Sequence, residues 1–98
     1  MAERKYTFKI AISAQADLKK AIKKNPAKRI KLRKAQRLLE EHGPTYPSFN
    51  THIFQGKKAG DENIYISYIE NNTPGAWRIH WSWWGESTIV ALYIGPHT

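Results

Sequence analysis

The residues best suited to chemistry gather near the end of the chain, between Gly75 and His97. From Trp77 to Trp83 the sequence alternates, so Arg78 and His80 share one strand face while tryptophan and isoleucine take the other. Arginine binds phosphate through a planar fork of donors, and histidine, with an ordinary pKa near 6.5, can accept or donate a proton at neutral pH. This pair predicts a site for proton transfer on an anionic substrate.

Two further histidines are candidates for the same chemistry. His97 follows the apolar run from Thr88 to Ile94, and His52 lies in a short segment that alternates like a strand. The alternatives are a frayed terminal residue for His97 and hydrogen-bonded sheet residues for His52 and His80. His42 ends a predicted helix, where interaction with the helix dipole is the better explanation. Cysteine is absent and no metal-type histidine spacing occurs, so neither a metal nor a cofactor is predicted.

The charge of the chain is strongly asymmetric. Net charge is +8, and residues 1–42 hold 13 of the 16 lysines and arginines. A one-sided basic surface favours a polyanionic partner, nucleic acid first and acidic lipid second, whereas the simpler alternative is a solvated pair of basic helices. No apolar run reaches the roughly 20 residues that span a bilayer, so we expect a cytoplasmic protein without a membrane segment.

The first half of the chain predicts a strand followed by two helices. Lys5 to Ile12 alternates as a strand, Ser13 suits the N-cap of a helix from Ala14 to about Lys24, and a second helix follows Asn25-Pro26 and ends near His42. The positions expected to face a sheet from the second helix are Ala27, Ile30, Ala35, Leu38 and Leu39. On another face Arg29, Arg33 and Arg37 recur every four residues, either to bind phosphate or to pair with Glu40 and Glu41.

The second half predicts four strands. They span Phe49 to Gln55, Ile64 to Glu70, and a hairpin whose two strands are joined at Gly85. Residues 56–63, with Lys57 and Lys58, are expected to form an exposed loop that either contacts RNA phosphates or is simply solvated. Trp84, Tyr65 and Tyr68 are suited to stacking on a base or to packing within the sheet. The order β-α-α-β-β-β-β predicts one α+β domain over residues 1–98, with both helices on a mainly antiparallel sheet of about five strands.

Three segments of this chain are similar to one known family, the RelE/ParE superfamily of bacterial type II toxin-antitoxin systems. They are Tyr6-Thr-Phe-Lys-Ile-Ala-Ile-Ser followed by Ala16-Asp-Leu-Lys-Lys, Gly75-Ala-Trp-Arg-Ile-His-Trp, and Leu92-Tyr-Ile-Gly-Pro-His. The resemblance covers most of the chain in the right order. It implies a curved antiparallel sheet that cradles a cleft, with the helices against its other face.

The resemblance also implies a function. RelE-type members are toxins that cut messenger RNA, often on the ribosome, and a cognate antitoxin protein silences them. ParE-type members share the fold and inhibit DNA gyrase without catalysis, and fold alone does not choose between the two. A non-toxic nucleic-acid-binding module is the third alternative.

Residue roles follow from the RelE-like reading. Arg78 would bind the scissile phosphate and His97 would act as general acid or base, with His80 and His52 in support. Lys57, Lys58, Trp84 and the arginines of the second helix would hold RNA. Cleavage would leave a 2′,3′-cyclic phosphate and a 5′-hydroxyl. The alternative for Arg78 is a structural arginine, stacked on an aromatic ring or paired with Glu70. This chain departs from the family at two positions. It has Thr98 where some relatives carry a terminal aromatic, and Ile66 near the position where others carry a glutamate, so a histidine would have to act as the base in place of that carboxylate.

Overall fold

The hairpin predicted near the C-terminus forms the middle of the sheet. The computed structural model describes residues 5–71 and 73–96, so His97 lies outside the described residues. Strands β4 (Trp77–Trp84) and β5 (Thr88–Pro96) pair antiparallel, and Gly85 takes a positive φ of 73° in the turn between them. Trp77, Ile79 and Trp81 are buried, which confirms the alternation expected of β4.

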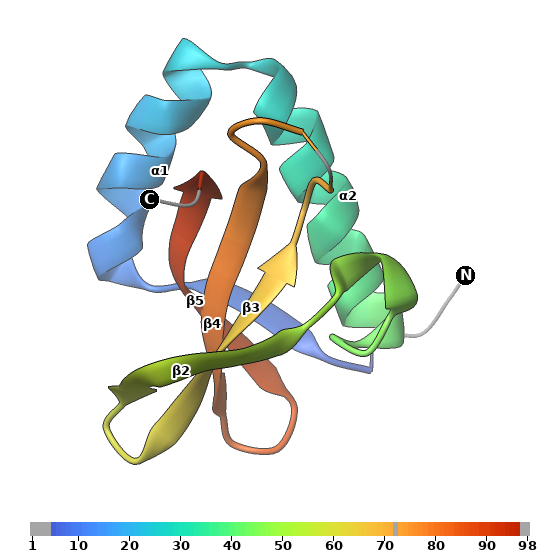
Figure 1. The fold of residues 1–98 in the computed structure, drawn as a ribbon, viewed down its shortest axis with the longest axis vertical. Coiled ribbons are helices and arrows are strands. Elements are labelled where there is room, and N and C mark those ends of the chain that lie inside the picture. Colours follow the sequence, from blue (N-terminus) through green and yellow to red (C-terminus); the bar gives the residue numbers. More distant parts are fainter. Residues whose placement is uncertain (1–4, 72, 97–98) are drawn as a thin grey trace.

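Five strands and two α-helices make up the described part of the chain (Figure 1). The remaining elements are β1 (Thr7–Ile10), α1 (Ile12–Lys24), α2 (Ala27–His42), a 3₁₀ turn (Pro47–Phe49), β2 (His52–Ala59) and β3 (Glu62–Tyr68). The sheet order is β1-β5-β4-β3-β2; β1 runs parallel to β5 and every other pairing is antiparallel. The predicted α+β architecture and element order are confirmed, and the sheet is mixed.

Both helices pack on the face of the sheet that carries Trp77, Ile79 and Trp81. Helix α2 contributes Leu32, Ala35 and Leu39 to this core, a spacing that keeps the three on one line of the helix surface. The predicted helix face is therefore partly wrong. Ile30 is 74% exposed and Ala27 is also exposed, because each lies away from the line that contacts the sheet.

The junction between the first strand and the first helix also differs from the prediction. Strand β1 ends at Ile10, and α1 begins at Ile12 with Ala11 in the N-cap position. The Ala11 N–H donates to the Ala91 carbonyl at 2.8 Å, and the Ala11 carbonyl accepts from Ala14 N–H at 2.9 Å. Pairing with β5 thus continues to the residue at which the helix starts, which leaves Ser13 inside the first turn rather than at the cap.

Residues 56–63 form a hairpin rather than a loop. Strand β2 runs through Lys57 and Lys58 to Ala59, and β3 begins at Glu62 after a tight turn at Gly60, whose φ is 63°. The register shifts between Ile53 and Lys58. Because β2 is an edge strand exposed over most of its length, its second half, residues 56–59, lacks the alternation that marks a half-buried strand. Phe49 lies in the 3₁₀ turn and is buried there, not in the strand as predicted.

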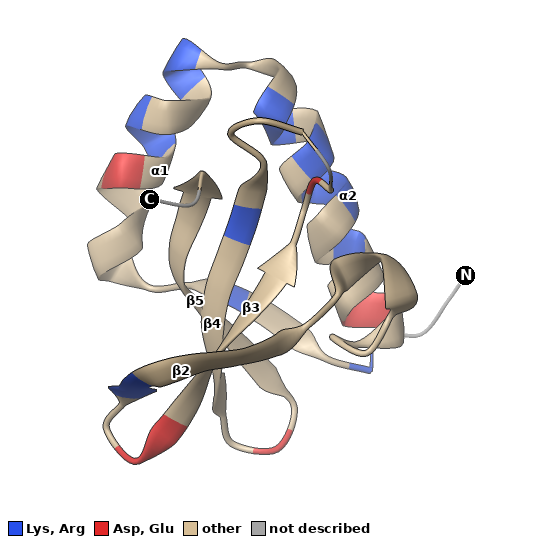
Figure 2. Cartoon of the chain, in the orientation of Figure 1, with Lys and Arg blue, Asp and Glu red and all other residues tan. Residues whose placement is uncertain are grey.

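Basic side chains are concentrated along the two helices, as Figure 2 shows. Arg29, Arg33 and Arg37 are all exposed on α2. Among the described helices, none is long and apolar enough to cross a membrane.

The packing of α2 can be tested by truncating one residue on each side of the helix. Leu39 has no exposed surface, so Leu39→Ala should lower the free energy of unfolding by about 3 kcal/mol through lost burial and a cavity. Ile30→Ala removes an exposed side chain and should change it by less than about 0.5 kcal/mol. Urea denaturation of both variants measures the difference. If Ile30→Ala lost more free energy of unfolding than Leu39→Ala, this packing would be wrong and the helix face expected from the sequence would be correct.

Candidate functional site

The sheet face opposite the helices collects three of the four predicted catalytic side chains. Arg78 lies opposite Tyr68 in the β3–β4 register, His80 opposite Ile66, and Ile66 opposite His52. Directly opposed residues of an antiparallel pair point to the same side of a sheet. Because Trp77, Ile79 and Trp81 point into the core, Arg78, His80, Tyr68 and His52 all belong to the other side, called the Arg78 face below. His97 falls outside the described residues.

Arg78 is half-buried on this face and stacks on an aromatic ring. Its guanidinium carbon lies 4.6 Å from the centroid of Tyr68. Its Nε is buried and has no hydrogen-bond acceptor within residues 5–71 and 73–96, nor does a carboxylate of those residues form an ion pair with it. The stacking is what a structural arginine would show. An anion-binding arginine, by contrast, requires a guanidinium that no carboxylate neutralises and an N–H that is available to donate, and within the described residues Arg78 has both.

Glu70 is not the partner of Arg78, which corrects that part of the structural alternative. Its carboxylate accepts hydrogen bonds from Lys28 at 2.6 and 2.7 Å, from Lys31 at 2.6 Å, and from the Trp77 backbone N–H at 3.0 Å. Burial raises the pKa of Glu70, but the two lysines and the Trp77 N–H outweigh burial and lower the pKa from 4.5 to about 2. Glu70 thus fastens α2 to the start of β4.

His52 has the geometry of a proton acceptor. Its Nδ1 lies 3.0 Å from the Asn50 carbonyl oxygen. Because a carbonyl only accepts, Nδ1 must carry the proton, and the neutral ring then holds its lone pair on Nε2. The His52 ring is exposed and meets the Tyr68 ring edge-on at 5.7 Å. Tyr68 therefore contacts both His52 and the Arg78 guanidinium.

His80 is held between two aromatic rings, at 5.2 Å from Phe54 and 5.3 Å from Tyr93. The Tyr93 hydroxyl donates to the Pro96 carbonyl at 2.9 Å. A Cβ on Gly95 would lie 2.8 Å from that hydroxyl oxygen, so a larger residue where β5 pairs with Arg78 would have to displace the Tyr93 ring. Sequence reasoning missed Phe54, Tyr93 and Gly95. The sequence of β5 does not show a simple alternation because its pairing with β4 shifts by one residue between His80 and Trp81. Tyr93 pairs with His80 and therefore lies on the Arg78 face.

The predicted RNA-binding residues do not form one surface. Lys57 and Lys58 are exposed on the edge strand β2. Trp84 is 68% exposed at the far end of β4, with Lys9 Nζ 5.7 Å from its ring centroid. The α2 arginines belong to a helix that packs on the opposite side of the sheet. The structure thus brings Arg78, His80 and His52 together and leaves the arginine stripe apart from them.

His42 lies away from the Arg78 face. Its ring stacks on Tyr46 with centroids 5.1 Å apart, and Nε2 is 3.9 Å from a Glu41 carboxylate oxygen. Within the described residues, no group of three or more histidine, aspartate or glutamate side chains is placed to hold a metal ion.

Comparisons with known proteins identify no relative. This chain matches no protein-family model, no curated protein sequence and no solved structure.

The contacts of Glu70 with Lys28, Lys31 and the Trp77 N–H, called the Glu70 clamp below, predict a specific dependence of stability on pH. The folded pKa lies below the ordinary value, so the clamp contributes fully above about pH 5.5 and is lost as pH falls from 4.5 through 2. Glu70→Gln should lower the free energy of unfolding by about 2 kcal/mol at pH 7, and the gap from wild type should narrow as pH falls below 4.5 and close only at about pH 2. Urea denaturation at several pH values measures this gap, with Glu86→Gln, an exposed acid, as the matched control. A gap that stays constant down to pH 3 would contradict the clamp.

Proposed function

We propose that this chain is a RelE-like toxin of a type II toxin-antitoxin system and a metal-independent endoribonuclease that cuts messenger RNA. The observation that carries the proposal is the half-buried Arg78, which has no carboxylate partner among the described residues and lies on the same sheet face as His52 and His80. An arginine in this state favours an anion, and phosphate matches its fork of donors.

RNA cleavage without a metal needs three contributions, which the proposal assigns to Arg78 and to histidines. A base takes the proton of the 2′-hydroxyl, whose oxygen attacks phosphorus to form the 2′,3′-cyclic phosphate. Arg78 stabilises the charge that develops on the phosphorane oxygens. As the bond to the 5′-oxygen breaks, an acid supplies a proton, giving the 5′-hydroxyl.

The proton-transfer roles belong to histidines in this proposal. Nε2 of His52 is the basic nitrogen of the neutral ring, because Nδ1 donates to Asn50, and this suits the general base. His97 follows the end of β5, in which Gly95 pairs with Arg78, and is proposed as the general acid. His80 supports the site between Phe54 and Tyr93.

The proposed partners follow from charge. The arginines of α2, together with Lys57 and Lys58 on β2, would hold messenger RNA or ribosomal RNA. An antitoxin protein would silence the toxin, and the reaction would take place in the cytoplasm without a cofactor.

One observation favours a second candidate, a nucleic-acid-binding module that does not cleave. The exposed arginine stripe belongs to α2, on the other side of the sheet from the Arg78 face. A polyanion held there would not need to reach Arg78. Such a module would bind RNA with an affinity that falls steeply with salt, and its expression would be harmless.

The decisive test is induction of the wild-type chain in a bacterial host with chemical mapping of RNA 5′ ends. Growth should stop, and new 5′-hydroxyl ends should appear within translated messages. Arg78→Ala should reduce these ends by a factor of about 100 to 1,000, because it removes the charge that stabilises the phosphorane. His97→Ala and His52→Ala should also abolish growth inhibition.

Lys5→Ala removes one exposed positive charge outside the site and serves as the control, with full toxicity expected. Thermal unfolding of each variant separates a lost function from a lost fold. If messages stay intact while growth stops and DNA–gyrase complexes are trapped, the ribonuclease proposal is wrong and a ParE-like gyrase inhibitor is supported. If messages stay intact and growth is normal, the nucleic-acid-binding module is supported.

A further inference from the structure

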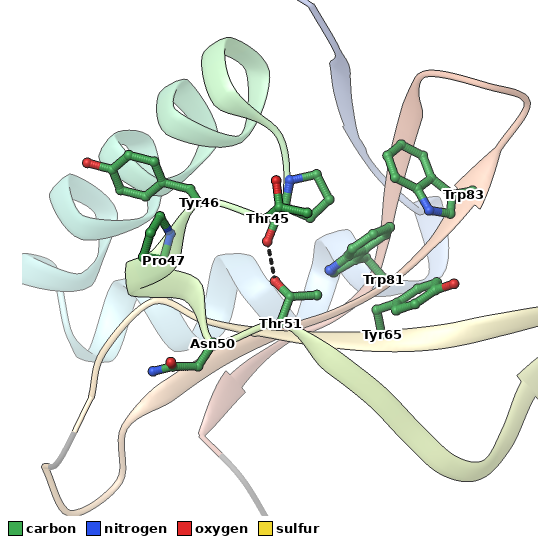
Figure 3. A pocket seen from close by; sticks show the side chains of 9 residues that line it. Thr45, Tyr46, Pro47, Asn50, Thr51, Tyr65, Trp81 and Trp83 are labelled. Atoms are coloured by element: carbon green, nitrogen blue, oxygen red, sulfur yellow. Dashed lines mark hydrogen bonds between the residues drawn. The ribbon is translucent and has the colours of Figure 1, made fainter.

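A cavity of about 470 Å³ opens on the helix side of the sheet, beyond the end of α2. The connector between α2 and β2 forms one wall, and strands β3 and β4 form the other (Figure 3). The lining residues are Pro44, Thr45, Tyr46, Pro47, Asn50, Thr51, Tyr65, Trp81 and Trp83. This is a different place from the Arg78 face, since Tyr65 and Trp81 point to the opposite side of the sheet from Tyr68 and Arg78.

The strand wall of this cavity is built from aromatic rings in contact. Tyr65 stacks on Trp81 with centroids 4.7 Å apart, and Trp83 meets Trp81 nearly at right angles at 5.0 Å. Trp81 is fully buried beneath the other two, whereas Tyr65 and Trp83 are only half-buried. Trp83 packs against the core on the strand face expected from the alternation, and its half-buried ring also lines the opening. The wall therefore offers aromatic surface to a planar ligand.

The polar groups of the floor are already satisfied by one another. Trp81 Nε1–H donates to Ser67 Oγ at 2.8 Å, the Ser67 and Thr51 hydroxyls lie 2.7 Å apart, and Thr51 Oγ1 donates to the Pro44 carbonyl at 2.6 Å. Since the indole only donates and the carbonyl only accepts, the Ser67 hydroxyl must donate to Thr51. The lining contains no lysine, arginine, aspartate or glutamate. A neutral, flat, largely apolar group suits such a cavity.

The cavity reaches the edge of the sheet one residue before His52. Thr51 lines the cavity, whereas the next residue, His52, contacts Tyr68 on the other side of the sheet. β2 is the edge of the sheet, so no further strand separates the cavity from the Arg78 face at this point. Lys57 and Lys58 are exposed on the same strand, toward its other end.

We propose that this cavity binds one nucleobase of a single-stranded RNA whose backbone passes around the edge strand β2 toward Arg78. The base stacks on the exposed surface of Trp83 and Tyr65, a contact that every base can make through its ring face. That the ligand is RNA rests on the proposed function. An aromatic side chain of a partner protein is the competing occupant. The base is favoured because the cavity ends at Thr51, one residue before His52 of the Arg78 face, on a strand that carries two exposed lysines.

The test uses the full chain and non-cleavable 2′-O-methyl RNA hexamers, each with a single abasic position. Titration calorimetry gives the dissociation constant of every hexamer. One abasic position should weaken binding to wild type by roughly tenfold, the scale of a lost base–aromatic stack. In Trp83→Ala the same position should change the dissociation constant less than about twofold, whereas Trp83→Phe should keep most of the effect. Ile30→Ala, exposed on α2, should behave as wild type.

Each outcome decides the inference separately from the ribonuclease activity. If the hexamers bind, and one abasic position weakens binding only when Trp83 is present, the base site is supported. If unmodified RNA is not cleaved in the same experiments, the proposed ribonuclease activity is wrong while the base site stands. Cleavage with no position that depends on Trp83 would overturn the base site alone. Failure of every hexamer to bind wild type, or Trp83-dependent binding of N-acetyl-tryptophanamide with no such dependence for RNA, would also overturn it.

Discussion

The alternation of side chains in β4 is the constraint on which the rest of the structure depends. Burial of Trp77, Ile79 and Trp81 against the helices sends Arg78 and His80 to the opposite face. A slip of one residue in register would exchange the two sets and place a charged guanidinium in the core. The same hydrophobic burial that stabilises the fold therefore also holds the candidate chemical groups on the other face of the sheet.

Ion pairs between Glu70 and the lysines of α2 hold this acid on the helix side of the sheet, away from Arg78. Glu70 lies in the segment that connects β3 to β4. Its carboxylate accepts hydrogen bonds from Lys28 and Lys31 of α2 and from the Trp77 N–H. Glu70 is thus committed to the junction between α2 and the start of β4. Arg78 keeps its positive charge without a carboxylate partner in the described ranges, in contact with the ring of Tyr68. The anion-binding role proposed for Arg78 and the ion pairs of Glu70 with α2 both follow from this arrangement.

The edge strand β2 links the two proposed ligand contacts. Thr51, which directly precedes β2, lines the aromatic cavity, and His52, the first residue of β2, contacts Tyr68 on the other side of the sheet. Exposed edges of sheets are sites where other chains can approach. In this protein the edge carries lysines and a register shift between Ile53 and Lys58, features that discourage pairing with another strand.

The sequence by itself determined the element order, the β4–β5 hairpin and the shared face of Arg78 and His80, because period-two alternation and turn residues are local properties. Only the tertiary structure decided which line of α2 is buried, that residues 56–63 pair as a hairpin, and that Glu70 meets Lys28 and Lys31 rather than Arg78. Those outcomes depend on contacts between residues far apart in the chain. The aromatic cavity belongs to the same class, since Tyr65 and Trp83 become neighbours of the connector only after β3 and β4 have packed beneath it.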